Sequence, residues 1–187
     1  MSLSTTSSQT VGPYYRIGLD WLIKTDLAPE GVAGERVVIE GRLTDADGKG
    51  IPDAVLEIWQ ANSRGRYPSP SDTREEIELE SAFRGWGRVP TDDNGVFRFT
   101  TIKPGSVPGY NGEPQAPHLN VTLLMRGILR HLYTRMYFPD DATTHDPVLA
   151  LVPQERRATL IARQTSPGKL HWDVVVQGQG ETVFFDC

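Results

Sequence analysis

The chain has 187 residues with a formal net charge of -5, and Cys187 is its only cysteine. This length suits one domain with a sizeable core, and a lone cysteine cannot form a disulfide within the chain. The acidic balance argues against nucleic acid as a partner, and the apolar runs are too short for a membrane span. The Ser/Thr-rich start has no signal-peptide pattern, so we expect a single cytoplasmic domain over residues 1–187.

The residues in chain order predict short strands joined by turns. An N-terminal arm over about residues 1–15 is followed by a Gly-containing connection with a short helix near Asp26. Alternating apolar and polar residues then predict strands over 36–43, 54–60, 96–101, from 118, and over 132–138, 160–164, 171–176 and 181–185, with a helical turn at 154–159. Gly- and Asp-rich turns separate several of them. The spacing favours an all-β fold, an antiparallel β-sandwich with long surface loops and only short helical turns.

A Pro/Gly-rich loop from Pro104 to Pro117 leads into the strand that begins at His118. Side chains alternate faces along a strand, so His118 and Asn120 share one face. By the same rule Arg135 lies between two tyrosines on one face of the next strand. A polar pair at the mouth of a strand, fed by a rigid loop, is a common place for chemistry on a β-scaffold.

Four motifs follow one another in the chain: W-Q-A-N-S-R-G-R-Y, T-I-K-P-G, A-P-H-x-N and H-L-Y-T-R-M-Y-F. In this order they resemble the intradiol ring-cleavage dioxygenases, whose ferric ion is held by two tyrosines and two histidines. Position by position, those ligands fall on Tyr67, Val107, His118 and Asn120. Valine has no donor atom and an asparagine amide is a poor ligand for a hard ion. The resemblance therefore implies that no residue of this chain binds the metal.

The resemblance further implies a non-ligating subunit in a hetero-oligomer of αβ units, whose β subunit binds Fe(III). The implied reaction is O2-dependent cleavage of protocatechuate to 3-carboxy-cis,cis-muconate, with no nucleic acid or membrane involved. In the family the matching arm lines the substrate pocket beside the iron, which assigns Thr10, Gly12 and Pro13 to substrate binding. Tyr14 would offer its hydroxyl to a displaced Tyr ligand of the partner. Arg135 would bind the anionic substrate, because a guanidinium group forms two parallel hydrogen bonds to a carboxylate.

Each of these residues also has a plainer interpretation. A single strand histidine such as His118 is more often a hydrogen-bonded structural residue than a ligand. Tyr67 would then be a packing or interface residue, and Arg135 an exposed or salt-bridged one. At the level of function, a non-catalytic β-sandwich binding or assembly module is the alternative. A self-sufficient dioxygenase is disfavoured by Val107 and Asn120.

Overall fold

The computed structural model describes residues 4–110, 112–140 and 146–186. The first three residues of the predicted arm and Cys187 lie outside the described residues.

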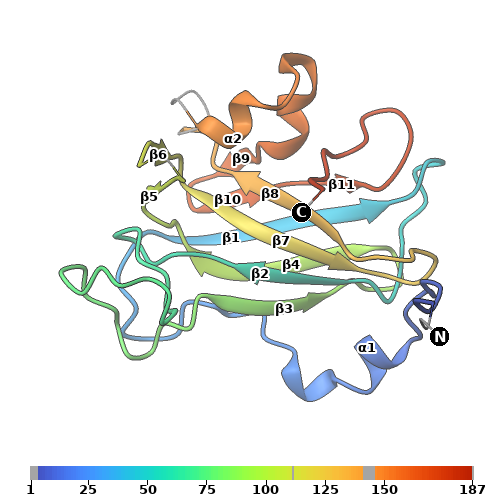
Figure 1. Cartoon of the computed structure of the whole chain (residues 1–187), viewed down its shortest axis with the longest axis horizontal. Helices are drawn as coiled ribbons and strands as arrows, with labels where there is room; N and C mark the ends of the chain where they lie inside the picture. Colours follow the sequence, from blue (N-terminus) through green and yellow to red (C-terminus); the bar gives the residue numbers. More distant parts are fainter. Residues whose placement is uncertain (1–3, 111, 141–145, 187) are drawn as a thin grey trace.

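Two sheets face each other (Figure 1). The first is antiparallel throughout, in the order β3 (Trp86–Pro90), β2 (Val55–Trp59), β7 (His118–Leu124), β8 (Leu132–Tyr137). The second sheet is built around β1 (Arg36–Thr44), and β4 (Val96–Ile102) pairs with one of its edges. The other edge of β1 pairs with β10 (Lys169–His171) and then with β11 (Val174–Val175). Strand β9 (Arg163–Ser166) pairs with the far edge of β10. A small hairpin joins β5 (Val107–Pro108) and β6 (Pro114–Gln115). The helical pieces are α1 (Tyr14–Ile17), η1 (Asp20–Leu22), α2 (Pro147–Ala150) and η2 (Gln154–Leu160).

The core fills the space between the two sheets. Alternation along each strand points the apolar side chains inward, which confirms the predicted β-sandwich. The almost completely buried members include Ile39, Leu43, Leu56, Ile58, Phe97, Phe99, Leu119, Val121, Leu123 and Met136. Among the described residues, no helix is long and apolar enough to cross a bilayer.

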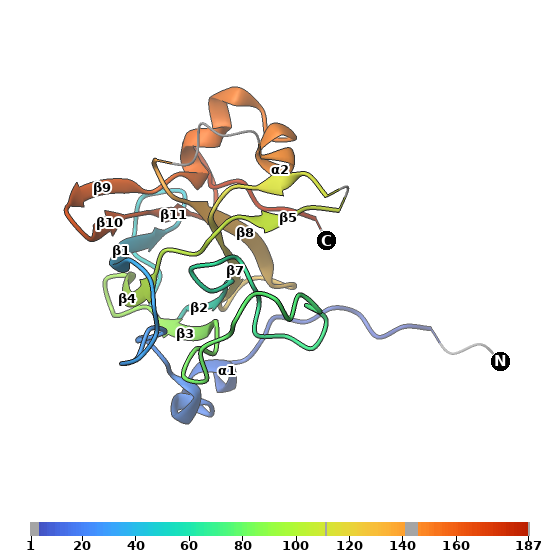
Figure 2. The same ribbon diagram turned by 90° about the vertical axis from the view of Figure 1, so that its left-hand side faces the viewer.

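The outer face of the β3-β2-β7-β8 sheet is covered by loops and by the N-terminal segment. Arg88 on β3 is buried there, pairs with Glu57 of β2 and donates to the carbonyl of Tyr15. Tyr15 in turn donates its hydroxyl to the Asp53 carbonyl. This partly buried charge pair and its bond to Tyr15 hold α1 against the sheet, whereas the chain near the N-terminus extends away from the body (Figure 2).

The helix expected near Asp26 is wrong, because Asp26 forms an isolated bridge to Thr100. Helical turns occur earlier instead. Pro13, whose ring fixes φ near -65°, precedes α1 with φ -63 and accepts from the N–H of Ile17. Pro13 was expected only as a residue of the arm, and the turn that begins at it was not predicted.

The last predicted strands also differ. The strand expected over 171–176 is split into β10 and β11, which both run parallel to β1. The split occurs because the Asp173 carboxylate accepts the N–H of Arg42 at 2.9 Å, in place of a backbone hydrogen bond between the two strands. The strand expected over 181–185 makes only an isolated bridge, from Phe185 to Tyr133. The strand expected over 160–164 begins later, at Arg163, since η2 extends to Leu160.

Candidate functional site

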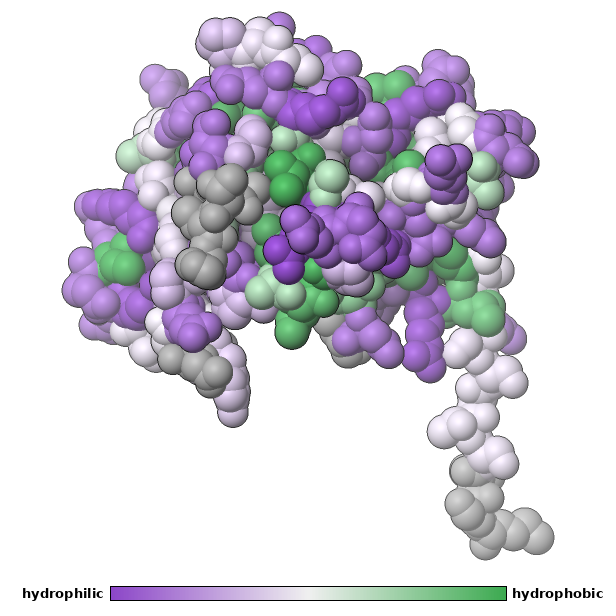
Figure 3. All heavy atoms as spheres, turned by 90° about the horizontal axis from the view of Figure 1, so that it is seen from above, coloured by the Kyte–Doolittle hydropathy of each residue, from purple (hydrophilic) through white to green (hydrophobic). Residues whose placement is uncertain are grey.

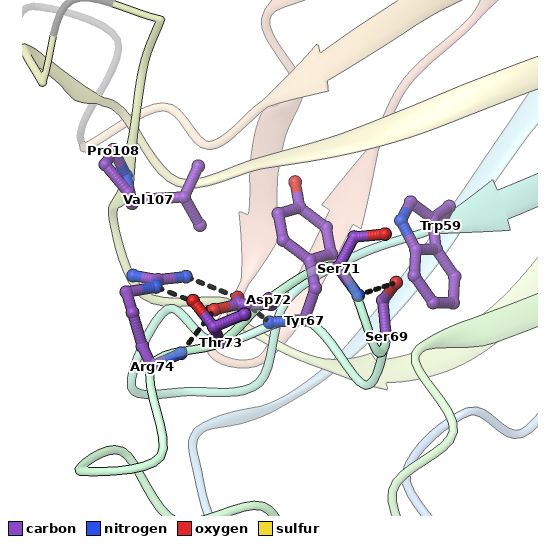
Figure 4. A pocket seen from close by; sticks show the side chains of 9 residues that line it. All are labelled: Trp59, Tyr67, Ser69, Ser71, Asp72, Thr73, Arg74, Val107 and Pro108. Carbon is purple, nitrogen blue, oxygen red and sulfur yellow. Dashed lines mark hydrogen bonds and ion pairs between the residues drawn. The ribbon is translucent and has the colours of Figure 1, made fainter.

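A cavity of about 490 Å³ opens on the outer face where β2 ends (Figure 4). Its walls come from the end of β2, the loop that follows it, and β5. The lining residues are Trp59, Tyr67, Ser69, Ser71, Asp72, Thr73, Arg74, Val107 and Pro108. The rings of Trp59 and Tyr67 stack at 5.7 Å between centroids with an angle of 16°.

Two buried amides explain why the W-Q-A-N turn meets the T-I-K-P-G segment. Gln60 donates to the Ile102 carbonyl at 3.0 Å and accepts from the Thr101 hydroxyl at 2.5 Å. Asn62 accepts the N–H of Arg66 at 2.9 Å, which closes the turn that leads to Tyr67. Both side chains are fully buried, and each has hydrogen-bond partners, as buried polar groups require.

Gly65 allows the two loops to pack closely. Its φ is +82, and a Cβ there would lie 2.0 Å from the Ser106 carbonyl oxygen. The N–H of Gly105 donates to the Asn62 carbonyl at 2.9 Å across the same contact. Only glycine fits this approach, and the result is that Tyr67 and Val107 line one cavity.

Of the four positions that match family ligands, two line this cavity and two lie on one face of β7, where Asn120 contacts Tyr67. Tyr67 and Val107 line the cavity, and the Asn120 amide donates to the Tyr67 hydroxyl at 3.2 Å. His118, on the same face of β7 as Asn120, is 3% exposed and donates from Nδ1 to the Ala116 carbonyl at 2.7 Å. The positional match made from the motifs therefore corresponds to a real spatial cluster.

The groups in this cluster carry little net charge at neutral pH. Burial, helped by the nearby Arg135 charge, lowers the pKa of His118 to about 4, so its ring is neutral. Burial raises the pKa of the Tyr67 phenol, which stays protonated. The hydrogen bond from Arg74 lowers the pKa of Asp72 to about 2, so these two form an ion pair, at 2.5 Å.

These residues do not fit a ferric ion. Val107 offers no donor, and the Asn120 amide directs an N–H at the phenol oxygen that a metal would need. His118 is the single remaining good nitrogen ligand. Within the described parts of the chain, no group of three or more His, Cys, Asp or Glu side chains is placed to hold a metal ion.

Arg135 does not line this cavity, but it is bonded to Gln115, whose amide also bonds to the lining residue Pro108. It is the cross-strand neighbour of Asn120, and its Nη1 donates to the Gln115 amide oxygen at 2.7 Å and to the Tyr137 hydroxyl at 3.4 Å. Both acceptors are neutral. No carboxylate among the described residues forms an ion pair with it.

The predicted arm residues lie elsewhere on the same sheet. The N–H of Gly127, in the turn between β7 and β8, donates to the Thr10 hydroxyl at 3.0 Å. Gly12 and Tyr14 are exposed and Pro13 is half-buried. Because Arg135 pairs with Asn120 in the half of the hairpin away from this turn, the structure does not bring the arm and Arg135 together within one chain.

A different arginine accompanies the arm. Arg126 precedes Gly127 in that turn, and its guanidinium pairs with Asp53 at 2.8 Å. The carbonyl of Asp53 also holds the Tyr15 hydroxyl, so turn and arm share an anchor. Sequence analysis missed Arg126, because nothing in the motifs places the arm against this turn.

Comparison with known proteins decides the family. Residues 12–178 match the family model described as Dioxygenase. The chain is 43% identical over 202 residues to the protocatechuate 3,4-dioxygenase alpha chain of Burkholderia cepacia, covering 99% of this chain and 98% of that one. The chain belongs to the intradiol dioxygenase family. The resemblance inferred from the motifs is thereby confirmed.

One further relative and one solved structure are also similar to this chain. The protocatechuate 3,4-dioxygenase beta chain of Burkholderia cepacia is 36% identical over 160 residues, covering 80% of this chain and 67% of that one. The crystal structure of catechol 1,2-dioxygenase from Pseudomonas arvilla C-1 has the same fold, with a TM-score of 0.60 at 22% identity, covering 82% of this chain and 55% of that one.

Proposed function

We propose that this chain is the α subunit of a protocatechuate 3,4-dioxygenase and works with a homologous β subunit that binds Fe(III). The near full-length match to an alpha chain supports this assignment. The observation that carries it is the cavity itself, where Val107 and Asn120 occupy two of the four ligand positions. The complex would cleave protocatechuate with O2 to 3-carboxy-cis,cis-muconate.

The N-terminal segment supports an assembly with such a partner. Tyr14, Ile17 and Trp21 are 79%, 63% and 78% exposed, although all three are large and apolar. Clustered exposed apolar side chains mark interaction sites. Residues 4–10 are all exposed. Figure 3 shows a segment of the chain that projects from the body. We assign Thr10, Gly12, Pro13 and Tyr14 to the wall of the partner's substrate pocket.

This chain's contribution to the reaction would be electrostatic and steric. The ferric ion of the partner would supply the activation of the bound catechol toward O2. An arginine of this chain would hold the substrate carboxylate in a bidentate contact and so fix its orientation. Arg126 is the candidate beside the arm, and Arg135 is the candidate from the family motif.

Steady-state kinetics on the reconstituted complex, with iron content held equal, tests these roles. Losing a charged partner of the reacting substrate costs about 2–4 kcal/mol of transition-state stabilisation, which corresponds to about 30- to 900-fold in kcat/KM. We expect this loss when the arginine that faces the substrate is replaced by alanine. Replacement by lysine should restore only part of the activity, because lysine cannot form the bidentate contact. The exposed Arg98→Ala on β4 is the matched control. If kcat and KM are unchanged in both Arg126→Ala and Arg135→Ala, neither arginine binds the substrate carboxylate.

Co-expression with an iron-bearing homologous β chain tests the assignment as a whole. We expect a stable mixed complex that cleaves protocatechuate, and no cleavage by this chain alone. If the two chains never associate, the assignment is wrong.

A further inference from the structure

We propose that the cavity lined by Trp59, Tyr67 and Val107 in this chain binds a small planar carboxylate, with the Arg135 guanidinium as its anion partner. The proposal concerns residues of this chain only and does not depend on the assembly proposed above.

The cavity has the size and walls for such a ligand. Its volume of about 490 Å³ lies within the range of small-molecule sites, about 300–1,000 Å³. The near-parallel rings of Trp59 and Tyr67 form an aromatic wall, and Val107 and Pro108 lie on the other side of Tyr67 (Figure 4). Aromatic and aliphatic walls of this kind favour a ring, which stacks with little loss of conformational entropy.

Among the described residues around the cavity, the cation that has no carboxylate partner is Arg135. Arg74 is neutralised by Asp72, whose carboxylate also accepts the N–H of Tyr67 at 2.8 Å. Arg135 has only the neutral acceptors Gln115 and Tyr137 among the described residues. A half-buried guanidinium that lacks an anion is a natural site for a carboxylate, because the charge-assisted fork is stronger than its bonds to neutral groups.

The buried carboxylate nearest to Arg135 does not compensate it directly. Among the described residues, the link from Asp146 to Arg135 is the Tyr137 hydroxyl, which donates to Asp146 at 3.0 Å. It also accepts the N–H groups of Val148, Leu149 and Ala116, at 2.9, 2.7 and 2.9 Å. Its oxygens are therefore committed to α2 and to the segment between β6 and β7.

Gln115 connects Arg135 to the cavity. Its amide oxygen accepts from Arg135, while its Nε2 donates to the carbonyl of Pro108, a lining residue, at 3.2 Å. The side chain thus spans from the guanidinium to the cavity edge. A carboxylate oxygen that enters from the cavity would replace the Gln115 amide oxygen as the acceptor for Arg135. The Gln115 side chain would rotate away to make room for it.

Calorimetric titration of the purified full chain with benzoate tests the proposal. We expect saturable binding of one benzoate per chain. Benzamide has the same planar ring but no charge, and it should bind at least about tenfold more weakly than benzoate. Inorganic phosphate is charged but has no planar ring, and it should also bind at least about tenfold more weakly. Equal binding of benzamide would refute the role of charge, and equal binding of phosphate would refute the planar walls.

Variants locate the site. Arg135→Gln should weaken benzoate binding about tenfold or more, whereas Arg98→Gln on β4, far from the cavity, should leave it unchanged. Val107→Trp should abolish binding by filling the cavity, with circular dichroism used to verify folding. If benzoate binds Arg135→Gln as tightly as the parent chain, or if no saturable binding occurs, the proposal is overturned.

Discussion

Protonation of His118 should control the acid stability of the chain. Its pKa is about 4 in the folded state because burial disfavours the charged ring, against about 6.5 when unfolded. Between these values the unfolded chain binds a proton that the native chain does not, so stability falls as the pH is lowered from about 6.5 to 4. Each pKa unit is worth about 1.4 kcal/mol, and the gap corresponds to about 3 kcal/mol.

Urea unfolding followed by tryptophan fluorescence between pH 7 and 4 measures this effect. His118→Asn keeps a donor for the Ala116 carbonyl and has no titrating ring, so its stability should fall by about 3 kcal/mol less than that of the parent over this range. His131→Asn, at an exposed position, should retain the parent slope. Parallel pH profiles for the parent and His118→Asn would refute the reasoning.

Other predictions follow from the packing of the same site. Val107→Tyr combined with Asn120→His should give a coloured chain that binds iron, since Tyr67 and His118 are already in place, whereas each single variant should stay colourless by visible absorption. Gly65→Ala should cost more than about 3 kcal/mol in denaturant unfolding, because its Cβ would meet backbone 2.0 Å away, whereas Gly48→Ala, with similar φ and open space, should cost about 1 kcal/mol. The ion pair of Asp72 should stabilise the fold above pH 4 and lose this effect toward pH 2, so Asp72→Asn should lower the melting temperature at pH 7 but not at pH 2.

The central strands could be predicted from the sequence because burial of one face produces their pattern of apolar and polar residues. β1 alternates strictly between a buried and a solvent-facing side. β2, β4 and β7 alternate in the same way except for two adjacent buried residues at one end, and burial fixes the register of such strands. The later strands were predicted less well. β10 and β11 depend on one side-chain bond from Asp173 to the main chain of Arg42, far away in the sequence, which no local pattern reveals.

For the candidate site, the motifs identified the positions that meet but not the environment of each side chain. Tyr67, Val107, His118 and Asn120 were matched by motif alone, and they do converge. That Arg135 bonds to Gln115 in its own chain depends on the β5–β6 hairpin. That Arg126 accompanies the arm depends on a contact between residues 117 positions apart. Neither contact leaves a periodic signal in the sequence.

Metal analysis with the visible spectrum, on this chain alone and in complex with an iron-bearing β chain, tests the central claim most directly. The account predicts a colourless lone chain without iron, and a coloured complex with one iron for each β chain and none for this one. A lone chain that carries close to one iron and shows the tyrosinate colour would contradict it.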